Sequence, residues 1–586
     1  MLNLQTSSAA KMPSLRSLPP LFLIAPAAIL LYSCFLGTTP FHSRGESREA
    51  LVVRAMVESN DFILPRSNIG EIAHKPPLYH WAAVAAVKAT GGLSEYAIRL
   101  PSILFAATGL VMLWYFVAVR PGSEVASLAT ALLASPLVWM QNAGHARVDM
   151  ALTVCLQGTL ISLFFVLERW REKRSTAWGW VCLAGIGGLL SMLSKGPMGL
   201  LLPVAIAGLY ALVLLRKPYL DTIRRLPLLP LVGALLVALC VGGLWYLKAY
   251  ASGGDEFFKV HVVNENLGRF IDVPDFKPGH IKPPYYSVVY LAVGWFPWTL
   301  LLPLVGTALW QARRELMKPE YSPILFCVCW VLVVFLLVTL SSAKRSVYLM
   351  PAYPALAYLS AWAVGQRTDS DLGRSARVGF TLFAILFGIL LLLLAIVAAT
   401  SVETLEAWDQ RWGLDLEQNA AAITAFRKGR LVLFPLLLAG CGVVAATMMF
   451  WRRKAAPMAL GILSLAMVTS GASVGAYVLR HLGQMQSAER FMVEVQKEVP
   501  DGAVLFMVNS QYYPPGYYAA RPCRISADSE TMIETPGSYA LSSEKHYLRM
   551  TDAFRETFEV IRKSHPYAAD GRRALWLLRH REAETE

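Results

Sequence analysis

The sequence has little charge for its length. Charged residues make up 16% of the 586 positions and hydrophobic residues 55%, whereas soluble domains carry roughly 25% charged residues. Such a chain cannot bury its apolar side chains in one water-soluble core, which excludes an ordinary soluble protein. Cysteine is also scarce: of eight residues, only Cys523 lies outside the long apolar stretches. The sequence therefore predicts no disulfide framework in its polar C-terminal part.

Long uncharged stretches are abundant instead. About 20 helical residues cross about 30 Å of hydrocarbon, and we identify about thirteen stretches of that order. They lie near residues 20–37, 98–118, 124–141, 149–167, 177–194, 196–215, 227–247, 286–309, 321–340, 346–364, 378–400, 430–450 and 457–479. The first lacks a convincing cleavage site and is expected to stay as an anchor. The sequence predicts an all-α polytopic membrane domain over 1–480.

The positive charges occupy alternate loops. The formal net charge of +14 would suggest nucleic-acid binding in a soluble protein, but here its distribution follows the positive-inside rule. The basic loops contain Lys11, Arg16, Arg169, Arg171, Arg174, Arg216, Lys217, Arg313, Arg314, Arg367, Arg374, Arg452 and Arg453. We therefore expect these loops in the cytoplasm, no nucleic-acid partner, and segments 38–97 and 248–285 as outer loops.

The tail has a different pattern from the rest of the chain. Strand-like runs at 503–508 and 574–578 flank a helical run through Phe554, Phe558 and Ile561, which is typical of a small α/β domain. We expect this domain to span 481–586 on the outer side. In the first outer loop, the spacing of Val52, Ala55 and Met56 predicts a short amphipathic helix along the membrane surface.

Ionisable residues gather on the outer side, where topology alone would not place cations. The carboxylates are Glu46 and Asp149, and the candidate phosphate-binding residues are Arg48, Lys75, Arg147, Lys195, Arg269, Lys344, Arg345 and Tyr348. Arginine and lysine form charge-assisted hydrogen bonds to phosphate oxygens, and a carboxylate can act as a general base. This pattern indicates group transfer from a lipid-linked phosphate. Tyr79 and Tyr285 are candidate substrate-binding residues.

Six strings in order carry a resemblance to a known family. They are Glu46 with Arg48, His74-Lys75-Pro76-Pro77-Leu78-Tyr79, Arg147 with Asp149, Ser194-Lys195-Gly196-Pro197, Asn266-Leu267-Gly268-Arg269-Phe270, and Tyr348 with Pro351 and Tyr353-Pro354. Over about 1–360 the chain resembles the bacterial aminoarabinose transferase branch of the protein O-mannosyltransferase superfamily. The resemblance implies a GT-C fold with thirteen spans and a periplasmic C-terminal domain, in the bacterial inner membrane.

The resemblance also implies an activity. Family members are glycosyltransferases that use a polyprenyl-phosphate sugar donor at the periplasmic face, here with an envelope lipid, glycan or protein as acceptor. We expect Glu46 to act as base and Asp149 to position the acceptor or the cations.

The chain departs from the family at three positions. Gly45 replaces the Asp of a usual Asp-Glu pair, His74 stands where Glu is frequent, and Asn266 stands where His is frequent. The last two positions lie near a divalent metal ion proposed for relatives, so that the resemblance implies His74 and Glu265 as metal ligands here.

Structural alternatives remain for these residues. Ser43 and Glu46 also fit a helix capping box, Asp149 fits a helix N-cap, and Lys195, Lys344 and Arg345 fit snorkelling residues at span ends. His74 also fits a surface histidine. For the whole chain, the alternative function is a lipid or sugar transporter or flippase, although transporters usually hold their ionisable residues near the bilayer midplane.

Overall fold

The structure is a computed structural model of the whole chain. It describes residues 26–33, 39–175, 177–214, 228–269, 279–366, 374–400, 404, 407, 411, 433–450, 456–476, 480, 483–484, 487–508, 512–526, 528–565 and 574–581. The boundary expected between 480 and 481 adjoins undescribed residues.

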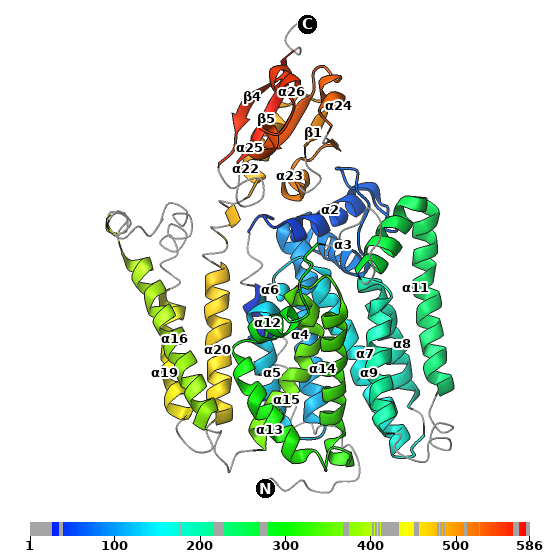
Figure 1. Cartoon of the computed structure of the whole chain (residues 1–586), viewed down its shortest axis with the longest axis vertical. Helices are drawn as coiled ribbons and strands as arrows, with labels where there is room; N and C mark the ends of the chain where they lie inside the picture. Colours follow the sequence, from blue (N-terminus) through cyan, green and yellow to red (C-terminus); the bar gives the residue numbers. More distant parts are fainter. Residues whose placement is uncertain are drawn as a thin grey trace.

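Helices dominate the described part of the chain before residue 480 (Figure 1). Residues 26–33 are helical. The α-helices that follow are α2 (Arg44–Ser59), α3 (Leu78–Thr90), α4 (Glu95–Ala118), α5 (Ser123–Ala134), α6 (Leu137–Ala143), α7 (Val148–Arg171), α8 (Trp178–Lys195), α9 (Met198–Leu214), α11 (Leu228–Phe257), α12 (Tyr286–Gly294), α13 (Leu302–Ala312), α14 (Ser322–Leu340), α15 (Tyr353–Gly365), α16 (Arg374–Ala399), α19 (Leu433–Phe450) and α20 (Ala456–Val474). Short π- or 3₁₀-segments are η2 (Phe258–Asn264), η3 (Leu267–Arg269), η4 (Trp298–Leu301), η5 (Pro319–Tyr321) and η6 (Ser346–Ala352).

These helices make the chain a multi-pass membrane protein. Within the described residues, 6 helices are long and apolar enough to cross a membrane, or 8 if each of two bent pairs is one span. One pair is α5 with α6, bent by 74°, and the other is α12 with the segment Trp298–Ala312, bent by 105°. Three shorter apolar helices accompany them. The expected count of thirteen remains a prediction.

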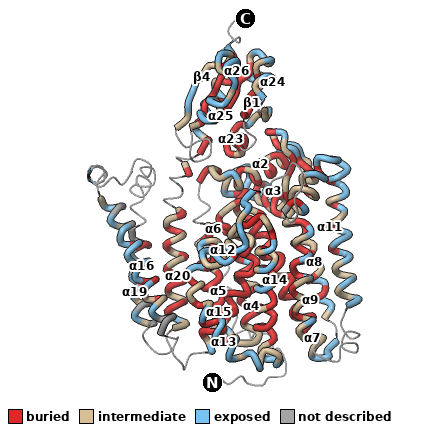
Figure 2. The backbone as a smooth tube through the Cα atoms, in the orientation of Figure 1, coloured by how far each residue is buried: buried red, intermediate tan, exposed pale blue. Residues whose placement is uncertain are grey.

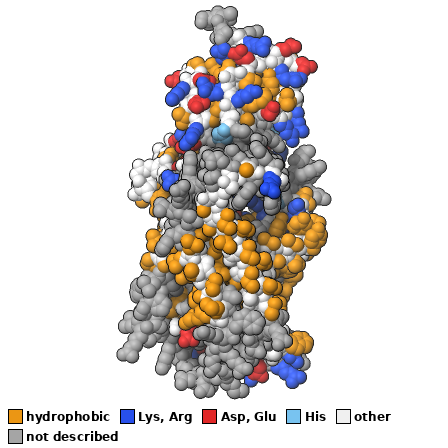
Figure 3. Space-filling model, turned by 90° about the vertical axis from the view of Figure 1, so that its left-hand side faces the viewer, with side chains coloured by type: hydrophobic (Ala, Val, Ile, Leu, Met, Phe, Trp, Pro, Cys, Tyr) orange, Lys and Arg blue, Asp and Glu red, His pale blue; other side chains and the backbone are white. Residues whose placement is uncertain are grey.

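The most buried part of the bundle surrounds α7. Figure 2 shows buried residues on α4, α5, α7, α14 and α15, whereas α11 and α16 expose much of their length at the two sides. The α7 sequence suits this place, because Asp149 lies in its first turn and Arg169 and Arg171 in its last, where each charge complements the helix dipole. On the face seen in Figure 3, hydrophobic side chains cover the helical part, and charged side chains gather on the C-terminal domain. This division matches a bilayer around the bundle.

Helices α2 and α3 lie across one end of the bundle (Figure 1). Ser43 caps α2 by accepting a hydrogen bond from the Glu46 amide at 3.4 Å, and Asn60 ends the helix in the left-handed conformation. The predicted amphipathic helix is therefore present. Its apolar side chains belong to a core that continues into the C-terminal domain through Tyr517, Leu505 and Leu541.

The C-terminal domain is a five-stranded sheet with helices. Its strands are β1 (Leu505–Met507), β2 (Cys523–Ile525), β3 (Tyr539–Ser543), β4 (Phe558–Lys563) and β5 (Leu575–His580), and its helices are α22 (Glu489–Glu498), α23 (Tyr513–Tyr518), α24 (Ser529–Ile533), α25 (Glu544–Tyr547) and α26 (Asp552–Thr557). The order is β2-β1-β3-β5-β4, with β1 parallel to β2 and β3, and β5 antiparallel to both of its neighbours.

The two predicted strands of this domain are present as β1 and β5. The predicted helix through Ile561 is wrong in its second half, because the chain leaves α26 at Thr557 and enters β4. The Phe554 and Phe558 rings stack with centroids 4.5 Å apart, so their helix-like spacing reflects contact across a helix-to-strand junction.

Candidate active site

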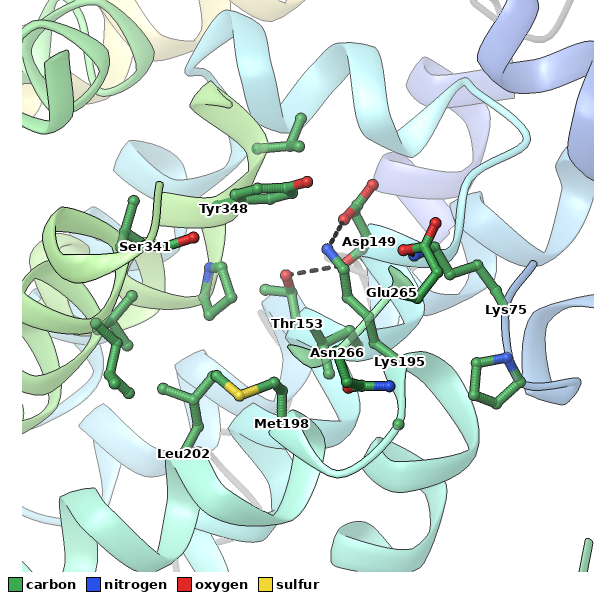
Figure 4. Close-up of a pocket in the computed structure, with 18 of the residues that line it drawn as sticks. Lys75, Asp149, Thr153, Lys195, Met198, Leu202, Glu265, Asn266, Ser341 and Tyr348 are labelled. Atoms are coloured by element: carbon green, nitrogen blue, oxygen red, sulfur yellow. Dashed lines mark hydrogen bonds and ion pairs between the residues drawn. The ribbon is translucent and has the colours of Figure 1, made fainter. Parts of the chain in front are cut away.

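A cavity opens at the end of the bundle covered by α2 and α3, where α7 begins and α8 ends (Figure 4). Its volume is about 120 Å³, and it is open to the outside on one side. One part of its wall is apolar, with Leu202, Val334, Leu337 and Val338. The other part is charged, with Lys75, Asp149, Lys195 and Glu265. The cavity can therefore receive a molecule that is apolar at one end and charged at the other.

Asp149 and Lys195 meet in this cavity because their helices pack antiparallel at one end. The Lys195 ammonium lies 2.5 Å from the Asp149 carboxylate and 4.5 Å from the centre of the Tyr348 ring, as Figure 4 shows. Lys195 is the last residue of α8, and Gly196 follows it with φ +80°, a conformation that favours glycine. The strings Arg147 to Asp149, Ser194 to Pro197 and Tyr348 to Pro351 thus converge, although they are distant in the sequence.

Two arginines lie next to this pair. Both Arg147 and Arg345 interact electrostatically with Asp149. Neither guanidinium has a hydrogen-bond or ion-pair partner within the described ranges. Burial lowers the pKa of Arg345, and repulsion by Arg147 lowers it further. Two half-buried guanidinium groups that repel each other form a site for an anion, since each offers donors that match phosphate oxygens.

The absence of a side chain at Gly45 leaves room for the guanidinium group of Arg147. A Cβ atom on Gly45 would lie 2.4 Å from the Arg147 Nη2 atom, far closer than atoms can approach. The departure from the family's Asp-Glu pair therefore does more than remove a carboxylate. It also makes room for the guanidinium of Arg147 beside the start of α2.

In the same charged part of the wall, Lys75 pairs with Glu265. His261 contacts the carbonyl of Ala73 at 2.6 Å, and the Asn266 amide donates to the carbonyl of His261 at 2.6 Å. These contacts join the loop before α3 to η2, which is how the strings around Lys75 and Asn266 come together. Lys75 is thus held in the wall by a carboxylate from a segment about 190 residues further along the chain.

The predicted metal ligands His74 and Glu265 both line the cavity. Each has another partner: His74 lies 3.5 Å from the Glu71 carboxylate, and Glu265 pairs with Lys75. Across the part of the chain that the structure describes, no three His, Cys, Asp or Glu side chains converge as a metal site would require. The described donor set does not fit a metal ion, and we derive no step through one.

Glu46 lies outside the cavity. It is 0% exposed and accepts hydrogen bonds from Arg99 at 2.9 and 3.2 Å and from the Ala146 amide at 2.9 Å. Burial acts to raise the pKa of Glu46, but the charges of Arg99 and His145 and these hydrogen bonds hold it well below its ordinary value. This environment does not support Glu46 as a base in contact with substrate, because Glu46 does not line the cavity and its oxygens accept hydrogen bonds from Arg99 and Ala146.

The sequence analysis did not predict the buried partners of Glu46 and of its neighbours on α2. Arg99 is the partner of Glu46, and His80 lies 2.9 Å from Glu49, which also pairs with Arg48 at 2.8 Å. A signal was available for Arg99, since a charge inside a predicted span is costly and usually has a partner. His80 and Glu49 carried no such signal, because both fell within the predicted outer loop 38–97.

The remaining predicted residues divide into three groups. Tyr348 lines the cavity. Lys344 is buried and bonds the Ser341 carbonyl, and burial lowers its pKa; Tyr79 is buried, with its hydroxyl donating to the Ile98 carbonyl at 2.7 Å. Tyr285 is 62% exposed. Neither Tyr79 nor Tyr285 lines the cavity, so the structure does not support contact with a substrate there. The Arg269 side chain lies outside the described residues.

Comparison with known proteins finds that the chain is similar to sugar transferases that use polyprenyl-phosphate donors. Residues 74–246 match the family described as dolichyl-phosphate-mannose-protein mannosyltransferase. The undecaprenyl phosphate-alpha-4-amino-4-deoxy-L-arabinose arabinosyl transferase of Pseudomonas aeruginosa strain LESB58 is 30% identical over 55% of this chain and 55% of its own length. An uncharacterised protein of Aquifex aeolicus is 27% identical over 58% of this chain and 62% of its own length. The chain thus spans somewhat over half the length of these relatives.

A solved structure extends the likeness over nearly the entire chain. ArnT from Cupriavidus metallidurans bound to undecaprenyl phosphate matches with a TM-score of 0.73 at 20% identity, covering 96% of this chain and 98% of that one. The chain therefore has the GT-C fold of ArnT, together with a small C-terminal sheet domain, as the resemblance implied.

Proposed function

We propose that this chain, an aminoarabinose transferase-like membrane protein with a GT-C fold, is a glycosyltransferase that moves a sugar from a polyprenyl-phosphate donor to an envelope acceptor. The observation that carries the proposal is a cavity with an apolar wall and the Asp149–Lys195 pair. Beside this pair lie Arg147 and Arg345, which have no hydrogen-bond or ion-pair partner among the described residues. A polyprenyl phosphate has the same division into a long apolar chain and a charged head. The sequence relatives are named for a donor of this kind.

The donor phosphate belongs beside Arg147, Arg345 and Lys195. A phosphate that leaves carries more negative charge as its bond to the sugar breaks, and fixed cations stabilise that charge without reorganisation. Lys195 can turn from Asp149 toward the phosphate, because its ammonium offers three donors. The same movement frees an oxygen of Asp149. Lys75 also lies in the charged part of the wall and adds positive charge there.

Asp149 is the carboxylate best placed for the chemistry. The acceptor hydroxyl oxygen attacks the anomeric carbon, the bond between that carbon and the phosphate oxygen breaks, and the electron pair leaves with the lipid phosphate. Asp149 takes the proton of the hydroxyl, so that charge and atoms balance, and a single displacement inverts the anomeric carbon. General base catalysis of this kind typically contributes about 10²- to 10⁴-fold. Glu46, expected from the sequence to be the base, instead fixes the first turn of α2.

The acceptor reaches the site from the side of α2, α3 and the C-terminal domain. Positive loops at the other end of the bundle favour an inner-membrane orientation with this side in the periplasm. The acceptor is an envelope lipid, glycan or protein with a hydroxyl group that can enter the open part of the cavity.

Transfer distinguishes this function from a flippase. Purified chain in mixed micelles should release undecaprenyl phosphate from radiolabelled undecaprenyl-phosphate sugars and move the label to envelope lipids, glycans or proteins. In sealed vesicles without acceptor, a flippase would still move labelled donor across the bilayer. Translocation without transfer would contradict the proposal, and transfer in detergent, where no bilayer separates two sides, would support it.

A further inference from the structure

The C-terminal domain touches the wall of the cavity through α23. The Tyr513 hydroxyl donates a hydrogen bond to the Glu71 carboxylate at 3.1 Å. The same Glu71 oxygen lies 3.5 Å from the His74 ring, and His74 and the next residue, Lys75, both line the cavity. Two side-chain contacts therefore join the sheet domain to the charged wall.

The loop that carries Glu71 is held at its base as well. Backbone hydrogen bonds tie Asn68 to the domain, with the Cys523 amide donating to the Asn68 carbonyl at 2.8 Å. The Asn68 side chain in turn donates to the Gly516 carbonyl at 2.9 Å. Within the loop, the Ser67 amide donates to the Glu71 carbonyl at 2.9 Å. The domain thus holds residues 67–71 as a unit, and Tyr513 acts at the end nearest the cavity.

The charges around Tyr513 favour its role as a donor. Burial raises the pKa of Tyr513, and the neighbouring Glu71 carboxylate raises it further, so that the hydroxyl keeps its proton. Arg48 interacts electrostatically with both Tyr513 and Glu265. Arg48 therefore links Tyr513 electrostatically to the Lys75–Glu265 pair of the cavity wall.

We infer that Tyr513 is a positioning residue for the donor site: its hydroxyl fixes Glu71, which holds His74 and, through the backbone, Lys75 in the cavity wall. On this basis the C-terminal domain completes the donor site and is more than a passive attachment. The inference rests on the proposed function, because the ligand that Lys75 would meet is the donor phosphate.

A neighbouring tyrosine provides a matched control. Tyr518 lies on the same short helix and also bonds a carboxylate, Glu95, at 2.8 Å, and it accepts from the Phe41 amide at 2.7 Å. Neither contact of Tyr518 leads to a residue that lines the cavity. Tyr513→Phe and Tyr518→Phe each remove one hydroxyl from the docked face of α23, so that loss of docking alone would affect both in the same way.

Binding of undecaprenyl phosphate to the full-length protein in detergent tests the inference. Tyr513→Phe should raise its Kd roughly 10-fold, as expected for loss of a hydrogen bond to a charged group, and Tyr518→Phe should leave it within about 2-fold. Glu71→Ala should raise the Kd similarly, and the double variant Tyr513→Phe/Glu71→Ala should bind no more weakly than Glu71→Ala alone, because contacting residues are not additive. Equal effects of the two tyrosine variants, or additive effects with Glu71→Ala, would overturn it.

Amide hydrogen exchange gives a second readout that needs no ligand. Tyr513→Phe should speed exchange in residues 71–75, and Tyr518→Phe should not. A wild-type chain that fails to bind undecaprenyl phosphate would refute the proposed function itself, whereas wild-type binding with unchanged Kd and unchanged exchange in Tyr513→Phe would refute only the role of Tyr513.

Discussion

Asp149 reaches the cavity with one ion-pair partner, Lys195 at 2.5 Å, and this contact sets its expected behaviour. Asp149→Asn keeps the size of the side chain but cannot accept a proton as a carboxylate does. We expect turnover to fall about 10²- to 10⁴-fold, while undecaprenyl phosphate binds within a few-fold of wild type. Single-turnover release of labelled undecaprenyl phosphate measures the first effect, and equilibrium binding the second. Near-normal transfer by the variant would show that the base lies elsewhere.

Arg147 and Arg345 should act on binding. Each has its guanidinium beside Asp149 without a described ion-pair partner, so Arg147→Ala and Arg345→Ala should each weaken undecaprenyl phosphate binding by roughly 10-fold or more. Binding to the wild-type protein should weaken less with added salt than a surface ion pair would, because partly buried charges are screened less. Arg524→Ala, an exposed arginine of β2, is the control. Equal affinity in the Arg147 and Arg345 variants and in this control would show that the phosphate does not bind beside Asp149.

At the scale of elements, α2 is fastened to the bundle by the buried pair of Glu46 and Arg99. Glu46→Gln leaves the Arg99 guanidinium buried without its carboxylate, which typically costs about 3 to 5 kcal/mol. We expect a clear loss of thermal stability in detergent at pH 7.

The stability that the Glu46–Arg99 pair contributes should fall as the pH is lowered. Because the folded-state pKa of Glu46 lies below its ordinary value, the pair stabilises the fold above the unfolded pKa of about 4.3 and loses this contribution as the pH falls toward the folded value. The stability difference between wild type and Glu46→Gln should therefore shrink below about pH 4. Unaltered melting of Glu46→Gln at pH 7, together with a large loss of turnover, would return Glu46 to the role of base.

Elements could be predicted from the sequence to different degrees. Spans such as α7 and α14 carry long apolar runs, and the cap at Ser43 is a local pattern, so both were predictable. The bends between α5 and α6 and between α12 and η4 were not, because an apolar run looks the same whether the helix is straight or bent. The burial of Glu46 depends on Arg99 and on the amide of Ala146, contacts that no local pattern encodes.

For the whole molecule, the orientation in the membrane is the central prediction. Ser59→Cys, at the exposed end of α2, should react with an impermeant maleimide added outside the inner membrane. Ser175→Cys, exposed just beyond the basic end of α7, should react only after permeabilisation. The wild-type chain labelled in parallel corrects for Cys182, Cys240 and Cys441, which are exposed on the spans. Reaction of Ser59→Cys from the cytoplasmic side alone would invert the topology.

For the whole molecule, the sequence predicted the residues of the site better than the contacts between distant segments. It indicated the strings that converge at the cavity, because charges on the outer side of a basic-inside protein are unusual. It gave no sign of the contact made by Tyr513, because more than 400 residues separate Tyr513 from Glu71 in the sequence. Tertiary packing alone decides which of the predicted cations have partners and which face the cavity.

The contact between Gly45 and Arg147 constrains how these two positions can evolve. Any ancestor with a side chain at position 45 must have held the guanidinium of position 147 elsewhere, because the two cannot occupy one volume. Exchanging an aspartate for glycine there also changes the local charge by one unit, so each replacement alters the benefit of the other. Relatives that keep the usual aspartate at position 45 together with the arginine of the Arg-x-Asp string should therefore hold that guanidinium in a different place, and the charge beside their donor pocket should differ.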